Sequence, residues 1–172
     1  MLDKLAKEIS DMAILAVVNE WKAQGHNLTG KAIQDINTVI KMQLNELVII
    51  GMVNDYMAIN NQGVPSDRIP YTPNSGRPPS KYITGLIQYA KKRMGASDKD
   101  AKSIAFAIAS KHKQEGMPTI KSARYSSTGK RTGFIETALE KISPDLLKLV
   151  EDSIRYSVEL TVMSFYKSIL GR

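Results

Sequence analysis

Proline is concentrated in one stretch of this 172-residue chain, and that stretch limits how the chain can fold. Five of the seven prolines lie within residues 65–79, where Arg77 is followed directly by Pro78 and Pro79. Because proline lacks a backbone N–H and fixes φ, these residues cannot form regular helix or sheet throughout. The sequence therefore predicts two structured segments joined by a long loop, and loops of this length are usually functional or become ordered on assembly.

The segment before the prolines is predicted to begin with a helix over residues 2–23. Gly25 is placed to end this helix in a left-handed conformation, and His26 is expected to be part of the polar turn that follows. Thr29 is expected to cap a short second helix. The apolar residues that recur near helical spacing in the first helix are Leu5, Ile9, Met12, Ala13, Ala16 and Trp21.

The hydrophobic pattern changes after this point. Residues 38–44 alternate between two faces, and residues 47–53 form a second short run rich in Val and Ile. Asn45 and Glu46 between the runs are typical of a turn, so the pattern predicts an antiparallel hairpin. Residues 55–60 are expected to form a turn of helix, with Tyr56 and Met57 packed in the core or at its edge.

Beyond the prolines the pattern is helical. Ser80 and Gly95 are expected to bound a helix over residues 81–94. A second helix over residues 98–114 begins at Ser97, and its small alanine face allows close packing. The fold class predicted for the whole chain is α+β, mostly helical, with a small antiparallel sheet packed by N-terminal, central and C-terminal helices. We expect a single domain over residues 1–172, with a helical insert at about 80–116.

The C-terminal part is predicted to contain two helices. After a polar loop over residues 118–130, Thr132 is expected to cap a short helix that includes Phe134 and Ile142. Ser143 followed by Pro144 is a typical helix start, with proline at the first helical position. A final helix beginning there is expected to extend as far as Ile169, although residues 158–162 also have strand propensity.

Positive charge is concentrated in the middle of the chain. Residues 65–132 hold fourteen Lys or Arg and four acids, a net charge of +10, whereas the remainder holds ten bases and thirteen acids, a net charge of −3. Such polarity favours an anionic surface, or an acidic face of another copy, as the partner. A DNA- or RNA-binding module that uses this basic block is therefore one alternative, and a solvated basic face is another.

The sequence offers little for chemistry. It has no Cys and two His, which excludes disulfides, thiolate metal sites and His-rich metal sites. The stretch from Ser127 to Lys130 resembles a phosphate loop, but Arg124 and Arg131 stand where that motif requires Gly and Ser or Thr. Asp98 and Asp100 are explained by a helix start. We therefore expect no enzyme activity, catalytic residues, cofactor or metal. The start lacks the features of a signal peptide, and no apolar run is long enough for a membrane span.

Several motifs together resemble one protein family. They are the turn Gly25-His26-Asn27-Leu28-Thr29-Gly30-Lys31, the stretch from Val53-Asn54-Asp55-Tyr56 to Asn61-Gln62-Gly63-Val64, and the stretch Thr132-Gly133-Phe134-Ile135-Glu136-Thr137-Ala138-Leu139-Glu140. In order and spacing they are similar to the siphophage tail-completion proteins of the head-to-tail neck. Residues 80–83 and 97–118 resemble a variant found in phages and prophages of gut anaerobes. The resemblance covers most of residues 1–142.

The resemblance implies a non-enzymatic virion protein, made in the host cytoplasm. Such a protein forms a homo-oligomeric ring at the head-tail junction, with six-fold symmetry expected and twelve-fold symmetry as the alternative. The ring would join the portal or adaptor side to the tail tube, contact neighbouring neck and tail-tube proteins, and let DNA pass without sequence-specific binding. The helical insert at 80–116 is larger than in the commonest members of the family.

The candidate assembly interface lies mainly in the basic loops. A ring needs heterologous contacts between different faces of neighbouring copies, and a basic block beside acidic flanks supplies complementary charge. A lumen that passes DNA must not grip it, so the basic residues are expected at protein contacts. The candidate interface residues are Arg68, Arg77, Lys81, Lys121, Arg124, Tyr125, Lys130 and Arg131.

Overall fold

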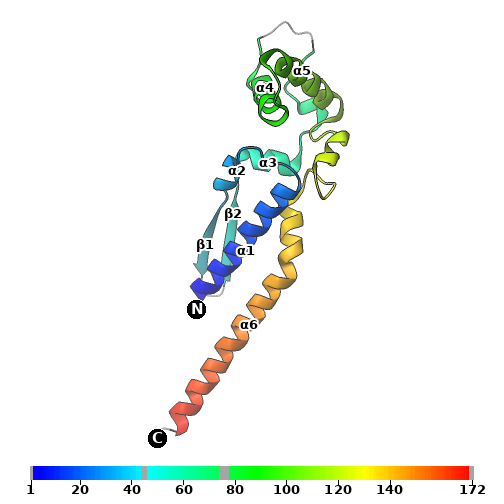
Figure 1. The fold of residues 1–172 in the computed structure, drawn as a ribbon. Helices are drawn as coiled ribbons and strands as arrows, with labels where there is room; N and C mark the ends of the chain where they lie inside the picture. Colours follow the sequence, from blue (N-terminus) through cyan, green and yellow to red (C-terminus); the bar gives the residue numbers. More distant parts are fainter. Residues whose placement is uncertain (1, 44–45, 74–77, 171–172) are drawn as a thin grey trace.

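The computed structural model describes residues 2–43, 46–73 and 78–170, and it shows the predicted α+β, mostly helical fold (Figure 1). Helix α1 (Leu2–Ala23) lies beside the hairpin and beside the first part of the final helix. The first helix was predicted with the same bounds. Gly25 follows it with φ of 72°, a left-handed conformation that glycine adopts without strain, as expected.

The predicted hairpin is confirmed. Strands β1 (Asn37–Gln43) and β2 (Glu46–Met52) pair antiparallel, each displaced by one residue from its predicted range. Asn45, expected in the turn, lies outside the described residues, and Glu46 belongs to β2. The hydroxyls of Ser10 in α1 and Thr38 in β1 are hydrogen-bonded at 2.5 Å, which ties the hairpin to α1. A two-stranded hairpin is marginally stable alone, so this packing is needed to hold it.

One short helix precedes the hairpin in the chain and another follows it. Helix α2 (Lys31–Gln34) has Gly30, with φ of 75°, at its cap position, one residue after the predicted Thr29. The Thr29 hydroxyl accepts a hydrogen bond from the backbone N–H of Lys31 at 3.4 Å. Helix α3 (Asp55–Gln62) is confirmed, and the Asn54 side chain accepts a hydrogen bond from the backbone N–H of Met57 at 2.9 Å.

The segment after the prolines forms a helical pair. Helices α4 (Lys81–Met94) and α5 (Asp98–Glu115) pack on each other, and the side chains of Ser80 and Ser97 cap them as predicted. Three alanines of α5 are buried, which confirms the expected close packing. The helical pair joins the rest of the molecule through an antiparallel bridge between Val64 and Met117.

Short 3-10 helices interrupt both predicted loops. Helix η1 (Ser66–Arg68) lies in the proline-rich stretch, and the Lys113 ammonium donates to the carbonyls of Asp67 and Ile69 at 3.3 and 3.4 Å. Helix η2 (Ile120–Tyr125) lies in the second loop. The proline-rich stretch was expected to order on assembly; residues 66–69 already pack against α5, and residues 74–77 lie outside the described residues.

The final helix differs most from expectation. Helix α6 (Phe134–Leu170) is continuous, with Pro144 inside it, so the predicted break at Ser143 and Pro144 was wrong. Proline removes one intrahelical hydrogen bond, at a cost of about 3 kcal/mol, and the turns on either side keep theirs. Residues 158–162 are helical despite their strand propensity. Helix α6 also begins at Phe134 without the predicted Thr132 cap: the backbone N–H of Ile135 donates to the Asn61 side chain of α3 at 3.0 Å.

The core is small and centres on aromatic contacts between α1 and α6. Trp21 is 1% exposed, and its ring meets that of Phe134 edge-on, with centroids 4.9 Å apart. Met57 of α3 and Ala138 of α6 are buried in the same cluster. From the sequence, Trp21 would be partly buried against the 81–94 helix or against a final helix beginning at Ser143. It is fully buried instead, against Phe134, which the sequence assigned to the short helix before Ser143.

Candidate assembly surfaces

The second half of α6 stands apart from the body of the molecule. We call residues 147–170 the arm; it extends away from α1 and the hairpin as a single helix (Figure 1). Phe165, near its end, is 64% exposed. Eleven large apolar side chains of the arm are exposed: Leu147, Ile154, Tyr156, Val158, Leu160, Val162, Met163, Phe165, Tyr166, Ile169 and Leu170.

The arm also changes polarity along its length. Between residues 148 and 159 five charged side chains share one side of the helix: Lys148, Glu151, Asp152, Arg155 and Glu159. Between residues 160 and 170 the only charged residue is Lys167. Val162, Tyr166 and Ile169 there continue the side that carried the charges. An exposed helix normally keeps a polar face toward water, and the last three turns lack such a face.

The hairpin exposes apolar side chains too. Val39 of β1 is paired with Ile50 of β2, and both are exposed, as is Met52. Val39 and Ile50 lie on the face opposite Thr38, which contacts α1. The hairpin therefore exposes an apolar surface in addition to that of the arm.

An apolar cavity of about 240 Å³ opens between α1, the hairpin and the first half of α6. Ile9 and Ala13 line it from α1, and Leu139 and Leu146 line it from α6. Thr38 also lines the cavity, and its hydroxyl is already bonded to Ser10. The cavity therefore suits an apolar group.

Most of the predicted interface residues are exposed. Arg68 lies in η1, Lys81 begins α4, and Lys130 follows the 3-10 helix η2. Within η2, Lys121 and Arg124 are exposed, and the Arg124 guanidinium lies 4.8 Å from the centre of the Tyr125 ring. Arg77 lies outside the described residues. The structure thus gathers Lys121, Arg124, Tyr125 and Lys130 on one loop, with Arg68 and Lys81 on other elements.

Arg131 differs from the other candidates because it belongs to a contact within the chain. It is half-buried, and its Nη1 donates to the backbone carbonyl of Gln24 at 2.7 Å. Burial lowers the pKa of Arg131. Its guanidinium holds the 126–132 loop against the end of α1, so it is not a free cation for a partner.

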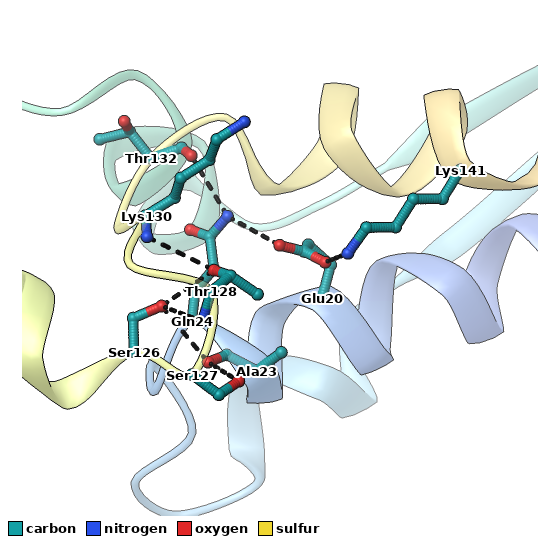
Figure 2. Close-up of polar contacts among 9 residues, drawn as sticks. All are labelled: Glu20, Ala23, Gln24, Ser126, Ser127, Thr128, Lys130, Thr132 and Lys141. Atoms are coloured by element: carbon teal, nitrogen blue, oxygen red, sulfur yellow. Dashed lines mark hydrogen bonds and ion pairs between the residues drawn. The ribbon is translucent and has the colours of Figure 1, made fainter.

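Figure 2 shows the polar network that fastens this loop to α1 and α6. Glu20 is 3% exposed, and its carboxylate accepts from the Lys141 ammonium at 2.6 Å and from the Gln24 amide at 3.1 Å. Gln24 also donates to the backbone carbonyl of Thr132, and Ser127 donates to that of Ala23. Burial alone would raise the pKa of Glu20, but the bonds from Lys141 and Gln24 outweigh it, so the pKa is lowered.

His26 lies in the predicted turn after α1, but its side chain is not on the surface. Its ring is buried and stacks on Trp21 with centroids 4.5 Å apart. Burial, with a contribution from the charge of Arg131, lowers the pKa of His26 to about 4. The loop residues 126–132 and helix α6 cover this turn, so a local polar sequence became part of the core.

The acidic side chains Asp98 and Asp100, and the side chain of His112, make contacts that stabilise the helical pair. Asp98 pairs with Lys91 at 2.6 Å, and Asp100 accepts from the Ser97 hydroxyl at the start of α5. The Tyr82 hydroxyl lies 2.6 Å from His112 Nδ1 and links α4 to α5. Within the described ranges, no three His, Asp or Glu side chains gather as a metal site would require.

The arm is the surface that sequence reasoning missed. The predicted interface lay in the basic loops, and the end of the final helix was treated only as a question of helix length. The available signal was the near absence of charge after Glu159 in a stretch with apolar residues on every side of the helix. Among the described residues, no helix is both long and apolar enough to cross a membrane.

When compared with known proteins, the chain matches no family model, no curated protein and no solved structure.

Proposed function

We propose that this chain is a non-enzymatic structural protein that assembles with copies of itself, and that the assembly is a ring at the head-tail junction of a phage virion. In that place it would join the portal or adaptor side to the tail tube and surround the passage for DNA. The location rests on sequence motifs that resemble those of tail-completion proteins, and the exposed surfaces of the structure support self-assembly.

The observation that carries self-assembly is the exposed apolar arm. Burying a large apolar side chain is worth about 1.5–3 kcal/mol relative to leaving it in water. The arm exposes eleven such side chains on one projecting helix, whereas soluble monomers rarely expose contiguous apolar patches beyond a few hundred Å². Contact with another protein surface would recover this free energy, and every copy of the chain brings the same surface.

Charge supports a head-to-tail arrangement. The basic block at residues 65–132 carries +10, and the rest of the chain carries −3. Helix α6 contains six acids and four bases, a net charge of −2. A basic face on one copy next to an acidic face on the next is attractive in a heterologous contact and repulsive in a contact between like faces.

Nucleic-acid binding is the second candidate function, favoured by the helical pair. Residues 81–115 contain eight bases and three acids, a net charge of +5, and Lys81, Lys92, Lys99 and Lys102 are exposed. Phosphate contacts make binding strongly salt-dependent. Tight, salt-dependent binding of duplex DNA by the monomer, without assembly, would favour this function over the first.

The test of self-assembly compares two pairs of added charges. Val162→Glu with Tyr166→Glu places two carboxylates one turn apart on the arm. Ser103→Glu with Ala107→Glu places two carboxylates one turn apart on the exposed side of α5 and serves as the matched control. Light scattering and electron microscopy should show closed rings for the unchanged chain and the control, and monomers for the arm variant. A chain that stays monomeric at all concentrations without nucleic acid would refute self-assembly.

The location in the virion is tested separately. An antibody raised against this chain should label particles of the phage that encodes it at the junction of head and tail. Labelling of the capsid surface, of the distal tail or of no particle would refute the location and leave self-assembly as a separate result.

A further inference from the structure

The apolar cavity and the arm are two complementary surfaces that one copy cannot bring together. Leu139 and Leu146 of α6 line the cavity, and the arm begins at the next residue, Leu147. Phe165 comes 19 residues after Leu146, which corresponds to about 28 Å along a helix axis. Because α6 is continuous and leads away from the body (Figure 1), the arm leaves its own cavity behind.

We infer that the last three turns of the arm, residues 160–170, dock into the cavity between α1, the hairpin and α6 of a second copy. This inference rests on the proposed self-assembly and specifies the surface that receives the arm. Each copy carries both the arm and this cavity, so every copy can donate to one neighbour and receive from another. Such a heterologous contact closes into a ring when the rotation between copies permits.

Size and chemistry fit this occupant. An apolar cavity of about 150 Å³ is large enough to bind benzene. At about 240 Å³, this cavity has room for the Phe165 ring together with an aliphatic side chain from the adjacent turn. Ile9, Ala13 and Ile49 on its walls offer apolar surface to match.

The small hydroxyl side chains of the arm are compatible with a dry contact. The hydroxyls of Thr161, Ser164 and Ser168 donate to backbone carbonyls within the arm itself, at 2.7–2.9 Å. They need no further partner when water is removed. These small residues share one side of the helix, which lets it lie close to a neighbouring surface.

The absence of cysteine from the chain allows a direct test. One preparation carries Ser164→Cys in the arm, and a second, tagged preparation carries Ala13→Cys in the cavity wall. The two are mixed, allowed to assemble and treated with a short bis-maleimide. We expect a crosslinked product that contains one tagged and one untagged chain. Replacing Ala13→Cys by Lys102→Cys, on the exposed side of α5, should abolish that product.

Every other outcome would contradict docking of the arm into the cavity, and each would point to a different cause. Rings in which Ser164→Cys chains crosslink only to each other would show that arms pair with arms, and would overturn the inference while leaving self-assembly intact. Rings without any mixed product would overturn it too. A chain that never assembles would refute the proposed function itself.

A second variant tests the cavity without a crosslinker. Ala13→Leu partly fills the cavity from the α1 side, so it should raise the dissociation constant of assembly at least tenfold. The matched change Ala107→Leu, on the exposed side of α5, should leave it within twofold. Circular dichroism confirms that both variants are folded. Unchanged assembly by a folded Ala13→Leu chain would overturn docking into this cavity.

Discussion

The two halves of α6 are one helix with opposite relations to water. In the first half Phe134 and Ala138 are buried in the core against α1, and Lys141 neutralises a buried carboxylate. In the second half every large apolar side chain after Val150 is exposed. Continuous helical hydrogen bonding therefore says nothing about where a helix gains its stability. The first half is held by packing within the chain, and the second half leaves its large apolar side chains exposed.

The largest difference between the two halves is expected when an aromatic contact is removed from each. Trp21→Ala removes the α1 ring that packs on Phe134 of the first half and should lower the free energy of unfolding by about 3–5 kcal/mol, since it leaves a cavity in the core. Phe165→Ala in the arm should change it by less than about 0.5 kcal/mol. Urea unfolding at concentrations where the chain is monomeric measures both. Equal losses would mean that the arm packs within its own chain.

Acid should destabilise the packed half before it affects the arm. The pKa of His26 is lowered to about 4 in the folded chain, below the ordinary value of 6.5. The unfolded chain therefore binds the proton first, and stability falls as the pH drops from about 6.5 to about 4, by up to about 3 kcal/mol. Urea unfolding across this range measures the slope.

His26→Phe should flatten most of that slope, because the ring stays stacked on Trp21 and cannot titrate. The part that remains should come from His112, whose pKa burial also lowers, and at the acid end of the range from Glu20 and Glu115, whose pKa values are lowered by their lysine partners. A slope that is the same with and without His26→Phe would show that His26 is accessible to water in solution.

Replacing one lysine in each half of α6 should again give a large loss of stability in the first half and a small loss in the second. Lys141→Met leaves the Glu20 carboxylate buried without its cation and should cost about 1–3 kcal/mol at neutral pH. The loss should shrink as the pH falls and Glu20 becomes protonated. Lys148→Met, about two turns later on the same helix, removes an exposed charge and should cost less than about 0.5 kcal/mol. Thermal unfolding of the two variants in parallel tests the difference.

The smallest effect on the stability of the monomer is expected from changes in the loop that carries Lys121, Arg124 and Lys130. Reversal of the exposed charges Lys121, Arg124 and Lys130 to Glu should shift stability by less than about 0.5 kcal/mol each. If this loop meets an acidic face of a neighbour, the same changes should weaken assembly strongly, because like charges across an interface cost several kcal/mol. Arg131 is left unchanged because it holds the loop to Gln24. Normal assembly of the triple variant would leave the arm as the contact that matters.

Local sequence determined most of the secondary structure of this protein. Serine caps and glycine stops fixed α4 and α5 because their hydrogen bonds lie within a few residues of each other. The alternating apolar pattern fixed the hairpin to within one residue, and the near absence of charge in residues 160–170 was readable without a structure.

Tertiary structure decided the features that depend on distant partners. Asn61 of α3 caps α6 from 74 residues away, so the local capping pattern at Thr132 was misleading. His26 became a core residue because α6 and the 126–132 loop cover it. Arg131 is held within the chain by its hydrogen bond to the backbone carbonyl of Gln24. Helix α6 continued through Pro144, where local preference favoured a new start. In each case a residue's own neighbours set its preference, and the contacts of the folded chain supplied the larger free energy.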